Sequence, residues 1–258
     1  MKLVSPAKIN RYFRVIGKRQ DGYHEIETEM HAIDLVDHLE IEKSDRDDWG
    51  DLDSQNLVIR AIKLFRTMSG EKFCVKVRLI KNIPMEAGLG GGSSNAATTL
   101  YGLSCLSRDP CSDPILAKWG SKLGSDVPFF FSSGAAYCYG KGEKLKENVA
   151  RLEDKPFFIA KPSYGLSTPL VYQNIKVNPI PSLESNDLET SAFFLKPLLK
   201  TLKEQLLGLG FDHVQMTGSG SAFYCTGDVK NPSIQGVTFY KVRPFYKNQD
   251  GWYLHENV

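Results

Sequence analysis

The stretch Pro84-Met-Glu-Ala-Gly-Leu-Gly-Gly-Gly-Ser-Ser-Asn-Ala-Ala97 decides how the rest of the sequence is interpreted. Four glycines lie within five positions: Gly88, Gly90, Gly91 and Gly92. Glycine permits positive φ and a close approach of backbone to ligand, and Ser93 or Ser94 is a favoured helix N-cap. A glycine loop that leads into a helix directs free N–H groups and the positive end of the helix dipole at one place. The stretch predicts an anion site, most often for phosphate, and a flexible surface loop is the alternative.

Composition excludes several classes of protein. The chain has 258 residues, 41% hydrophobic and 24% charged, with a net charge of +2, so nothing calls for nucleic acid or a membrane surface. No apolar stretch is long enough for a membrane span, and no signal or transit segment is visible, which favours a bacterial cytoplasm. The five cysteines lack CxxC spacing and the five histidines lack metal-ligand spacing, so we expect reduced thiols and no protein metal cluster.

Hydrophobic periodicity predicts alternating strands and helices before the glycine loop. The expected strands are 3–15, with a break at Ser5-Pro6, then 23–35, 39–42 and 73–80, and a helix is expected over 54–68. Ser54 is the expected cap of that helix and Gly70 its end. The last strand delivers the chain to the glycine loop.

After the loop we expect a helix to about Leu106, a helix over 111–123 capped by Asp113, and a strand over 135–139. A charged stretch then suggests a domain boundary between residues 1–153 and 154–258. The second part is expected to hold a strand from 155 and helices from Thr168, from 186 and over 197–207. It should also hold a proline-rich loop over 177–185, a second glycine loop, Thr217–Ser221, between two strands, and a strand-like tail over 237–255.

Three known phosphate loops do not match. A P-loop needs a lysine after its last glycine, and none follows here. The dinucleotide fingerprint needs a glycine where this chain has Ser93, and it belongs near the start of a domain. The protein-kinase motifs H-R-D and D-F-G are absent from the sequence.

The loop resembles the phosphate loop of the GHMP superfamily of small-molecule kinases, and Thr217–Ser221 resembles that superfamily's C-terminal motif. Narrower motifs resemble one family within it, the 4-diphosphocytidyl-2-C-methyl-D-erythritol kinases. These motifs are Pro6-Ala-Lys-Ile-Asn10, Asp21-Gly-Tyr-His24, Leu123-Gly-Ser-Asp-Val-Pro-Phe129 and Asn186-Asp-Leu188. The likeness runs from residue 6 to about 225 and is weaker in the short C-terminal tail.

The resemblance implies an α+β, two-domain fold, with an N-terminal half like ribosomal protein S5 domain 2 and a ferredoxin-like C-terminal half. It implies ATP-dependent phosphorylation of the 2-hydroxyl of diphosphocytidyl-methylerythritol in the non-mevalonate isoprenoid pathway, by a monomer or weak homodimer in the cytoplasm. The alternatives are a homoserine- or mevalonate-type kinase of the superfamily, a catalytically inactive nucleotide-binding protein, and, with least support, a dinucleotide-dependent oxidoreductase.

The same resemblance makes Lys8 and Asp126 the catalytic pair. Asp126 would be the general base for the acceptor hydroxyl, and Lys8 would keep that carboxylate ionised and help to polarise the hydroxyl. Taken alone, Lys8 would be a solvated strand residue and Asp126 a turn-capping residue.

By resemblance, ATP and Mg²⁺ bind over the glycine loop and the start of the preceding helix. Ser94 is the expected hydroxyl near the metal, and Glu86, where the family usually has glycine, should point to solvent because a triphosphate would repel it. The expected nucleotide-binding residues are Pro84, Met85, Glu86, Ala87, Gly88, Leu89, Gly90, Gly91, Gly92, Ser93, Ser94, Asn56, Leu57, Val58 and Lys81. Asn56 to Val58 is also an ordinary helix start.

The substrate residues follow from the same motifs. Tyr23 and Tyr172 would stack on the cytosine ring, and His24 would hydrogen-bond to its edge. Asn10 and Thr168 would hold the methylerythritol or phosphate portion. For Tyr172, simple surface packing at a helix start is the alternative.

Overall fold

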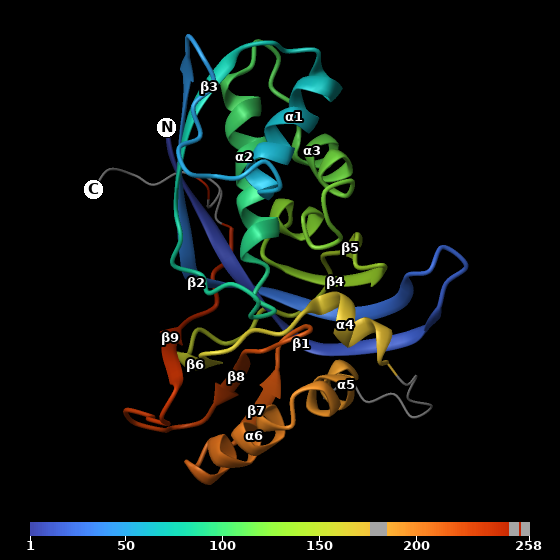
Figure 1. Cartoon of the computed structure of the whole chain (residues 1–258), viewed down its shortest axis with the longest axis vertical. Helices are drawn as coiled ribbons and strands as arrows, with labels where there is room; N and C mark the ends of the chain where they lie inside the picture. Colours follow the sequence, from blue (N-terminus) through green and yellow to red (C-terminus); the bar gives the residue numbers. More distant parts are fainter. Residues whose placement is uncertain (176–184, 248–252, 254–258) are drawn as a thin grey trace.

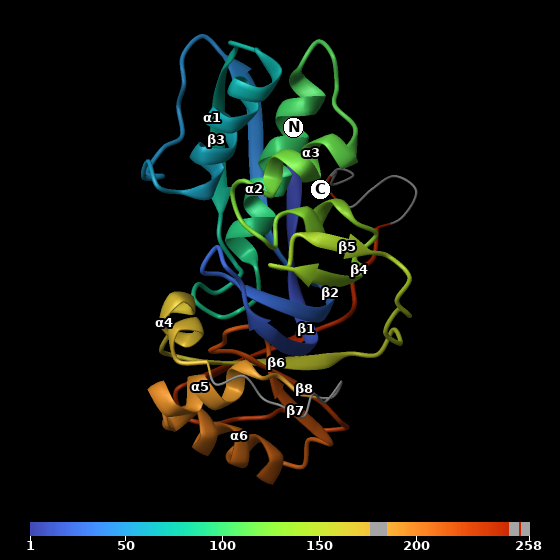
Figure 2. The ribbon, with the colours of Figure 1, turned by 90° about the vertical axis from the view of Figure 1, so that its right-hand side faces the viewer.

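The computed structural model describes residues 1–175, 185–247 and 253, and it confirms the expected α+β class. Two antiparallel sheets carry the described strands. The first holds β1 to β5 in the order β1-β2-β4-β5, with β3 paired to β2, and the second has the order β7-β8-β6-β9. Figure 1 places the first sheet with α1 to α3, and Figure 2 shows the second sheet with α5 and α6 at the opposite end of the molecule.

A long hairpin of β1 (Lys2–Lys18) and β2 (His24–Ser44) forms the centre of the first sheet. The expected break at Ser5-Pro6 is a shift of register between Pro6 and Ala7 within a continuous strand, since a bulge accommodates a proline that has no N–H to donate. The two strands expected over 23–35 and 39–42 are one strand, because that shift lets β2 continue its pairing past Val36.

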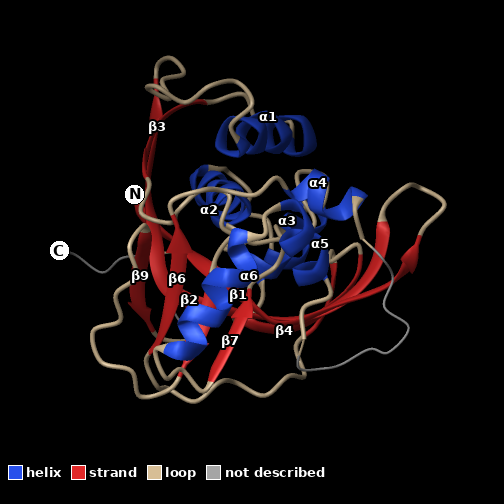
Figure 3. Ribbon diagram, turned by 60° about the horizontal axis from the view of Figure 1, so that its bottom comes forward, coloured by secondary structure: helices blue, strands red, loops and turns tan. Residues whose placement is uncertain are grey.

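The other strands of this sheet are β3 (Cys74–Ile80), β4 (Ala135–Gly140) and the short β5 (Lys144–Lys146), which the sequence did not predict. Helices α1 (Leu57–Ser69), α2 (Gly91–Leu106) and α3 (Asp113–Gly120) and a 3₁₀ turn, Pro128–Phe131, enclose the first core with it. Figure 3 shows α1 and α2 on the same side of the strands. No helix in the described ranges is long and apolar enough to span a bilayer.

Three predicted helix caps are wrong. Helix α1 is capped by Asn56, whose Oδ1 accepts a hydrogen bond from Val58 N at 3.0 Å, and Gly70 ends it as expected with φ 76°. Helix α2 starts at Gly91 after Gly90 (φ 69°), because the glycines themselves can make the turn. Helix α3 begins after Ser112, so Asp113 lies in the first turn, where a carboxylate favours the helix dipole.

The second sheet consists of β6 (Phe157–Pro162), β7 (His213–Met216), β8 (Phe223–Thr226) and β9 (Val237–Val242). Helices α4 (Thr168–Gln173), α5 (Leu188–Leu195) and α6 (Leu198–Gly208) accompany it, in agreement with the sequence pattern. The proline-rich loop expected over 177–185 lies outside the described residues except for Ser185. Beyond residue 247 the predicted tail is described only at Tyr253.

Segments near both ends of the chain pack into the core of the opposite half of the molecule. Phe13, Val15 and Ile26, at the tip of the first hairpin, pack into the core formed by α5, α6 and the second sheet. In return, Tyr253 is buried in the first core, and its carbonyl accepts a hydrogen bond from Val4 N at 2.9 Å. The division at 153/154 therefore stays a prediction.

The two glycine loops are also hydrogen-bonded to each other. Ser221 N donates to Glu86 O at 3.1 Å, and Ala222 N donates to Ala87 O at 3.2 Å. Gly88, with φ +75°, approaches so closely that a Cβ there would lie 2.0 Å from Thr217 O. Only glycine fits this position without moving one loop away from the other.

We predict that Gly88→Ala separates the loops and destabilises the protein, because both the left-handed φ and the Thr217 carbonyl oppose a side chain. A strained φ costs about 1–3 kcal/mol, and the clash adds to it, so the thermal midpoint should fall by about 5 °C or more. Gly17→Ala is the matched control, since a Cβ there meets nothing within 4 Å. Circular dichroism melts would refute the packing argument if the two variants unfolded at the same temperature.

Candidate active site

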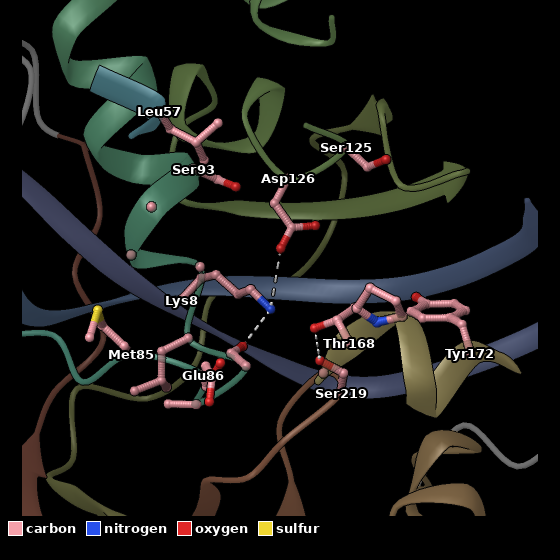
Figure 4. Close-up of a pocket in the computed structure, with 18 of the residues that line it drawn as sticks. Lys8, Leu57, Met85, Glu86, Ser93, Ser125, Asp126, Thr168, Tyr172 and Ser219 are labelled. Carbon is pink, nitrogen blue, oxygen red and sulfur yellow. Dashed lines mark hydrogen bonds and ion pairs between the residues drawn. The ribbon is translucent and has the colours of Figure 1, made fainter. Parts of the chain in front are cut away.

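A cleft of about 1060 Å³ runs between the glycine loop, the hairpin tip and α4. Most of the predicted site residues line it: Lys8, Tyr23, His24, Asn56, Leu57, Lys81, Pro84 to Ser93, Asp126, Thr168 and Tyr172. Figure 4 shows that they come from both halves of the molecule. Asn10, Val58 and Ser94 are buried and do not line the cleft.

Lys8 is a buried ammonium at the meeting point of the two loops. Its side chain is 3% exposed, and its Nζ donates to Asn10 Oδ1 at 2.6 Å and to Gly88 O at 2.7 Å. Asp126 Oδ2 lies 3.6 Å from the same Nζ (Figure 4). Lys8 is thus no solvated strand residue, because β1 turns this side chain inward beneath the glycine loop.

Asp126 lies in the turn before the 3₁₀ segment Pro128–Phe131 and faces the open cleft, with its side chain 33% exposed. Within the described part of the chain its carboxylate pairs with Lys8 and caps no backbone N–H, so the capping interpretation does not hold. Beneath the pair lies Cys138, whose thiol pKa is raised mainly by complete burial, with a further increase from Asp126. The Asp126 carboxylate is therefore accessible to solvent from the cleft.

The start of α2 forms one end of the cleft. Ser94 N makes the first intrahelical hydrogen bond, to Gly90 O at 2.9 Å. The amides of Gly91 to Ser93 precede that bond and lie at the N-terminal end of the helix, where amides have no intrahelical partner. These donors and the helix dipole fit a phosphate group.

A buried carboxylate that the sequence analysis missed holds Lys81 beside this loop. Asp37 is fully buried; it bonds the Lys81 ammonium and accepts from Ile83 N at 2.8 Å and from Asn95 Nδ2 at 2.9 Å. Asn95 Oδ1 in turn accepts from Lys81 Nζ at 3.0 Å. This network fixes a cation near Gly91, where a Cβ would lie 3.2 Å from Lys81 Nζ.

Ser93 and Ser94 have different environments from those expected. Ser94 is fully buried in α2, and its Oγ has no hydrogen-bond partner among the described residues. Ser93 lines the cleft, and its hydroxyl points toward the Asp126 side in Figure 4. A helix turns successive side chains about 100° apart, so Ser93 and not Ser94 presents its hydroxyl to the cleft where a metal was expected.

Glu86 is exposed, as expected, and its backbone has φ +51°. The left-handed φ explains why glycine suits this position better than a residue with a side chain. The side chain extends away from the phosphate end and lies against Gly165, where a Cβ would come within 2.0 Å of Glu86 Oε2. It thus contacts the second half and does not oppose a bound phosphate.

The other end of the cleft is aromatic. The His24 and Tyr172 rings lie 5.6 Å apart at an angle of 37°, and Tyr23 is 57% exposed at the rim. Burial and the nearby Lys18 ammonium lower the pKa of His24, so its imidazole is neutral at pH 7 and can both donate and accept a hydrogen bond. Burial raises the pKa of the Tyr172 phenol. This end suits a flat polar ring.

Polar groups lie between the two ends. Thr168 Oγ1 and Ser219 Oγ are 2.7 Å apart and bring α4 and the second glycine loop together. Asn10 is fully buried and satisfied by Lys8 and by Thr28 Oγ1, to which its Nδ2 donates at 2.8 Å. Asn10 therefore holds Lys8 and does not line the cleft, so its expected contact with the substrate stays a prediction. Ser219 lines the cleft and had been missed, although its loop was noted as a motif.

Comparison with known proteins agrees with this geometry. Residues 56–134 match the N-terminal domain of the GHMP kinases. The chain is 41% identical to the 4-diphosphocytidyl-2-C-methyl-D-erythritol kinase of Protochlamydia amoebophila (strain UWE25), over 98% of this chain and 93% of that relative. It is 37% identical to the chloroplastic kinase of the same name from Arabidopsis thaliana, over 91% of this chain and 69% of that relative.

Solved structures give the same assignment. A crystal structure of 4-(cytidine 5'-diphospho)-2C-methyl-D-erythritol kinase matches with a TM-score of 0.80 and 31% identity, over 95% of this chain and 100% of that one. A mevalonate kinase matches with a TM-score of 0.67 but only 16% identity, over 96% of this chain and 100% of that one, which shows a shared fold alone. The chain therefore belongs to the 4-diphosphocytidyl-2-C-methyl-D-erythritol kinase family of the GHMP kinases, as its sequence motifs predicted.

Proposed function

We propose that this protein transfers the γ-phosphoryl group of ATP to the 2-hydroxyl of 4-diphosphocytidyl-2-C-methyl-D-erythritol, a step of non-mevalonate isoprenoid synthesis. The observation that carries the proposal is the Lys8–Asp126 pair, which faces the cleft between an anion-binding helix start and an aromatic pocket. The relatives' shared name supplies the identity of the acceptor.

The donor phosphates bind at the glycine loop, on the amides of Gly91 to Ser93 and within reach of the Lys81 ammonium. Cations and oriented amides neutralise the charge that phosphoryl transfer spreads over the phosphate oxygens. Asn56 and Leu57, at the start of α1, line the adjoining part of the cleft and contact the nucleoside. Val58 is buried beneath them and supports this contact from below.

The donor set fits Mg²⁺, which takes few protein ligands and is held largely by phosphates and water. In the described residues no group of three or more His, Cys, Asp or Glu side chains could form a metal cage. The Ser93 hydroxyl faces the cleft beside the helix start and would hold the ion. When bound, Mg²⁺ neutralises phosphate charge during transfer.

Asp126 accepts the proton of the acceptor hydroxyl as that oxygen bonds to the γ-phosphorus and ADP leaves. The 2-hydroxyl is a tertiary alcohol and a poor nucleophile, so positioning and a nearby base both matter. Lys8 orients the carboxylate, since its ammonium lies 3.6 Å from Asp126 Oδ2. Thr168 lies on the opposite wall and positions the methylerythritol portion.

The cytosine ring stacks at the aromatic end, with Tyr23 and Tyr172 as its platforms and neutral His24 bonded to its edge. Stacking on an aromatic side chain contributes about 1–3 kcal/mol per base. All groups invoked here come from one chain, which supports the further proposal that a monomer or weak homodimer is active. We place it in the cytoplasm, where ATP is available.

We predict that Asp126→Asn lowers kcat by about 10²- to 10⁴-fold, because the amide cannot accept the hydroxyl proton. ATP affinity, measured by titration with a non-hydrolysable analogue, should change little, since Asp126 lies outside the helix start. Asp45→Asn, on an exposed loop, is the control for loss of a surface carboxylate. Turnover of the Asp126 variant at the wild-type rate would exclude this residue as the base.

A second prediction concerns the acceptor. In a coupled ADP-release assay, purified protein should turn over diphosphocytidyl-methylerythritol and leave homoserine and mevalonate unphosphorylated, because neither carries a ring for the aromatic end of the cleft. Release with homoserine or mevalonate would assign another GHMP activity. Release with none of the three would indicate a nucleotide-binding protein without this chemistry.

A further inference from the structure

The turn between β4 and β5 forms a wall of the cleft that neither the site prediction nor the mechanism uses. It comprises Gly140 to Glu143, and two of its glycines have positive φ, 76° at Gly140 and 104° at Gly142. A Cβ on Gly142 would lie 3.6 Å from Ser125 Cβ and 4.0 Å from Asp126 Oδ1. One side of this turn therefore lies beside the Asp126 carboxylate.

The neighbouring residue reaches the other end of the site. Lys141 lines the cleft, and its Nζ lies 4.5 Å from the centroid of the Tyr23 ring. Since Gly142 lies beside Asp126 and the Lys141 ammonium lies over Tyr23, the turn extends from the proposed catalytic carboxylate to the proposed base-stacking ring. An acceptor that occupies both ends at once must pass this turn.

The charge of Lys141 is available to a ligand. In the described part of the chain no carboxylate lies within ion-pair distance of its ammonium, which rests on the π face of Tyr23 and acts only at longer range on the Asp21 carboxylate. Its backbone N–H, not its side chain, is held by Glu143 Oε2 at 2.6 Å. A second ammonium, Lys18, lines the same end and lowers the pKa of His24. An ammonium of this kind attracts an anion, and the cation–π contact fixes its position.

We propose that Lys141 binds the diphosphate that links the cytidine to the acceptor alcohol, while its stem covers the outer face of Tyr23. This inference rests on the proposed function and adds a specificity-determining residue to it. The diphosphate is the only anionic part of the acceptor, and it lies in the chain of bonds between the ring and the alcohol. Lys141 thus recognises the link between the two ends, which a free alcohol or a nucleoside lacks.

The test compares cytidine with CDP as ligands, by calorimetry, with the donor site filled by a non-hydrolysable ATP analogue. Lys141→Met keeps the unbranched stem over Tyr23 and removes the charge. We expect its affinity for CDP to fall about tenfold, as for loss of one charge-assisted hydrogen bond, and its affinity for cytidine to change less than about twofold. Lys141→Arg should retain CDP binding within about threefold, since guanidinium also stacks on an aromatic ring and binds phosphate.

Lys144→Met is the matched control. It removes the exposed ammonium of a lysine three positions further along the chain. This ammonium lies 5.7 Å from the Tyr139 ring and does not line the cleft, so CDP binding should not change. Turnover should follow binding: Lys141→Met raises KM for the acceptor about tenfold and leaves KM for ATP unchanged. Added salt should weaken CDP binding to the wild type more than to Lys141→Met, because the interaction is between charges.

Three results would overturn the inference. Equal losses for cytidine and CDP would mean that Lys141 acts only through Tyr23. Unchanged CDP affinity in Lys141→Met would remove any role in binding. Equal binding of cytidine and CDP by the wild type would show that the diphosphate is not recognised, without affecting the proposed function. The proposed function fails instead if the wild type releases no ADP with diphosphocytidyl-methylerythritol.

Discussion

The buried ammonium of Lys8 is the constraint on which the rest of the site depends. A charge that is only 3% exposed is costly unless it is fully hydrogen-bonded or paired. Its ammonium donates hydrogen bonds to Asn10 Oδ1 and Gly88 O and forms an ion pair with Asp126, and these partners come from β1, the glycine loop and the turn before Pro128. The requirement to satisfy one lysine thus fixes the distance between the phosphate loop and the catalytic base.

The glycines of both loops are required by close packing around Lys8 as well as by the proposed phosphate binding. A Cβ on Gly90 would lie 3.0 Å from Lys8 Cγ, and one on Gly218 would lie 3.2 Å from Lys8 Nζ. Both loops must therefore lack side chains where they close over the lysine. The second loop completes the enclosure of the ammonium from the C-terminal half, which explains why a motif so far along the chain belongs to the same site.

Sequence patterns predicted the element order well because hydrophobic periodicity is local, and they failed where long-range contacts decide. The merging of two expected strands into β2 depends on its pairing with β1, which is such a long-range contact. The start of α2 at Gly91 was missed for a local reason, the left-handed conformation of Gly90. Lys8 and Asp126 were identified through resemblance to a family, since neither is distinctive alone. Asp37 and Lys141 belong to no motif, and only the folded chain brings Asp37 to Lys81 or Lys141 to Tyr23.

Lys8 and Lys141 both line the cleft and carry the same charge, but they differ in what they can bind. Lys8 has its two shortest hydrogen bonds, 2.6 and 2.7 Å, to groups of the protein, and only the longer contact with Asp126 faces the ligand. It can orient a carboxylate and polarise one oxygen, but it cannot bind a polyanion without giving up its own partners. Lys141 has a π face as its neighbour and donors to spare. The burial of Lys8 therefore supports its proposed role in catalysis, and the open rim supports the proposed role of Lys141 in recognition of the acceptor.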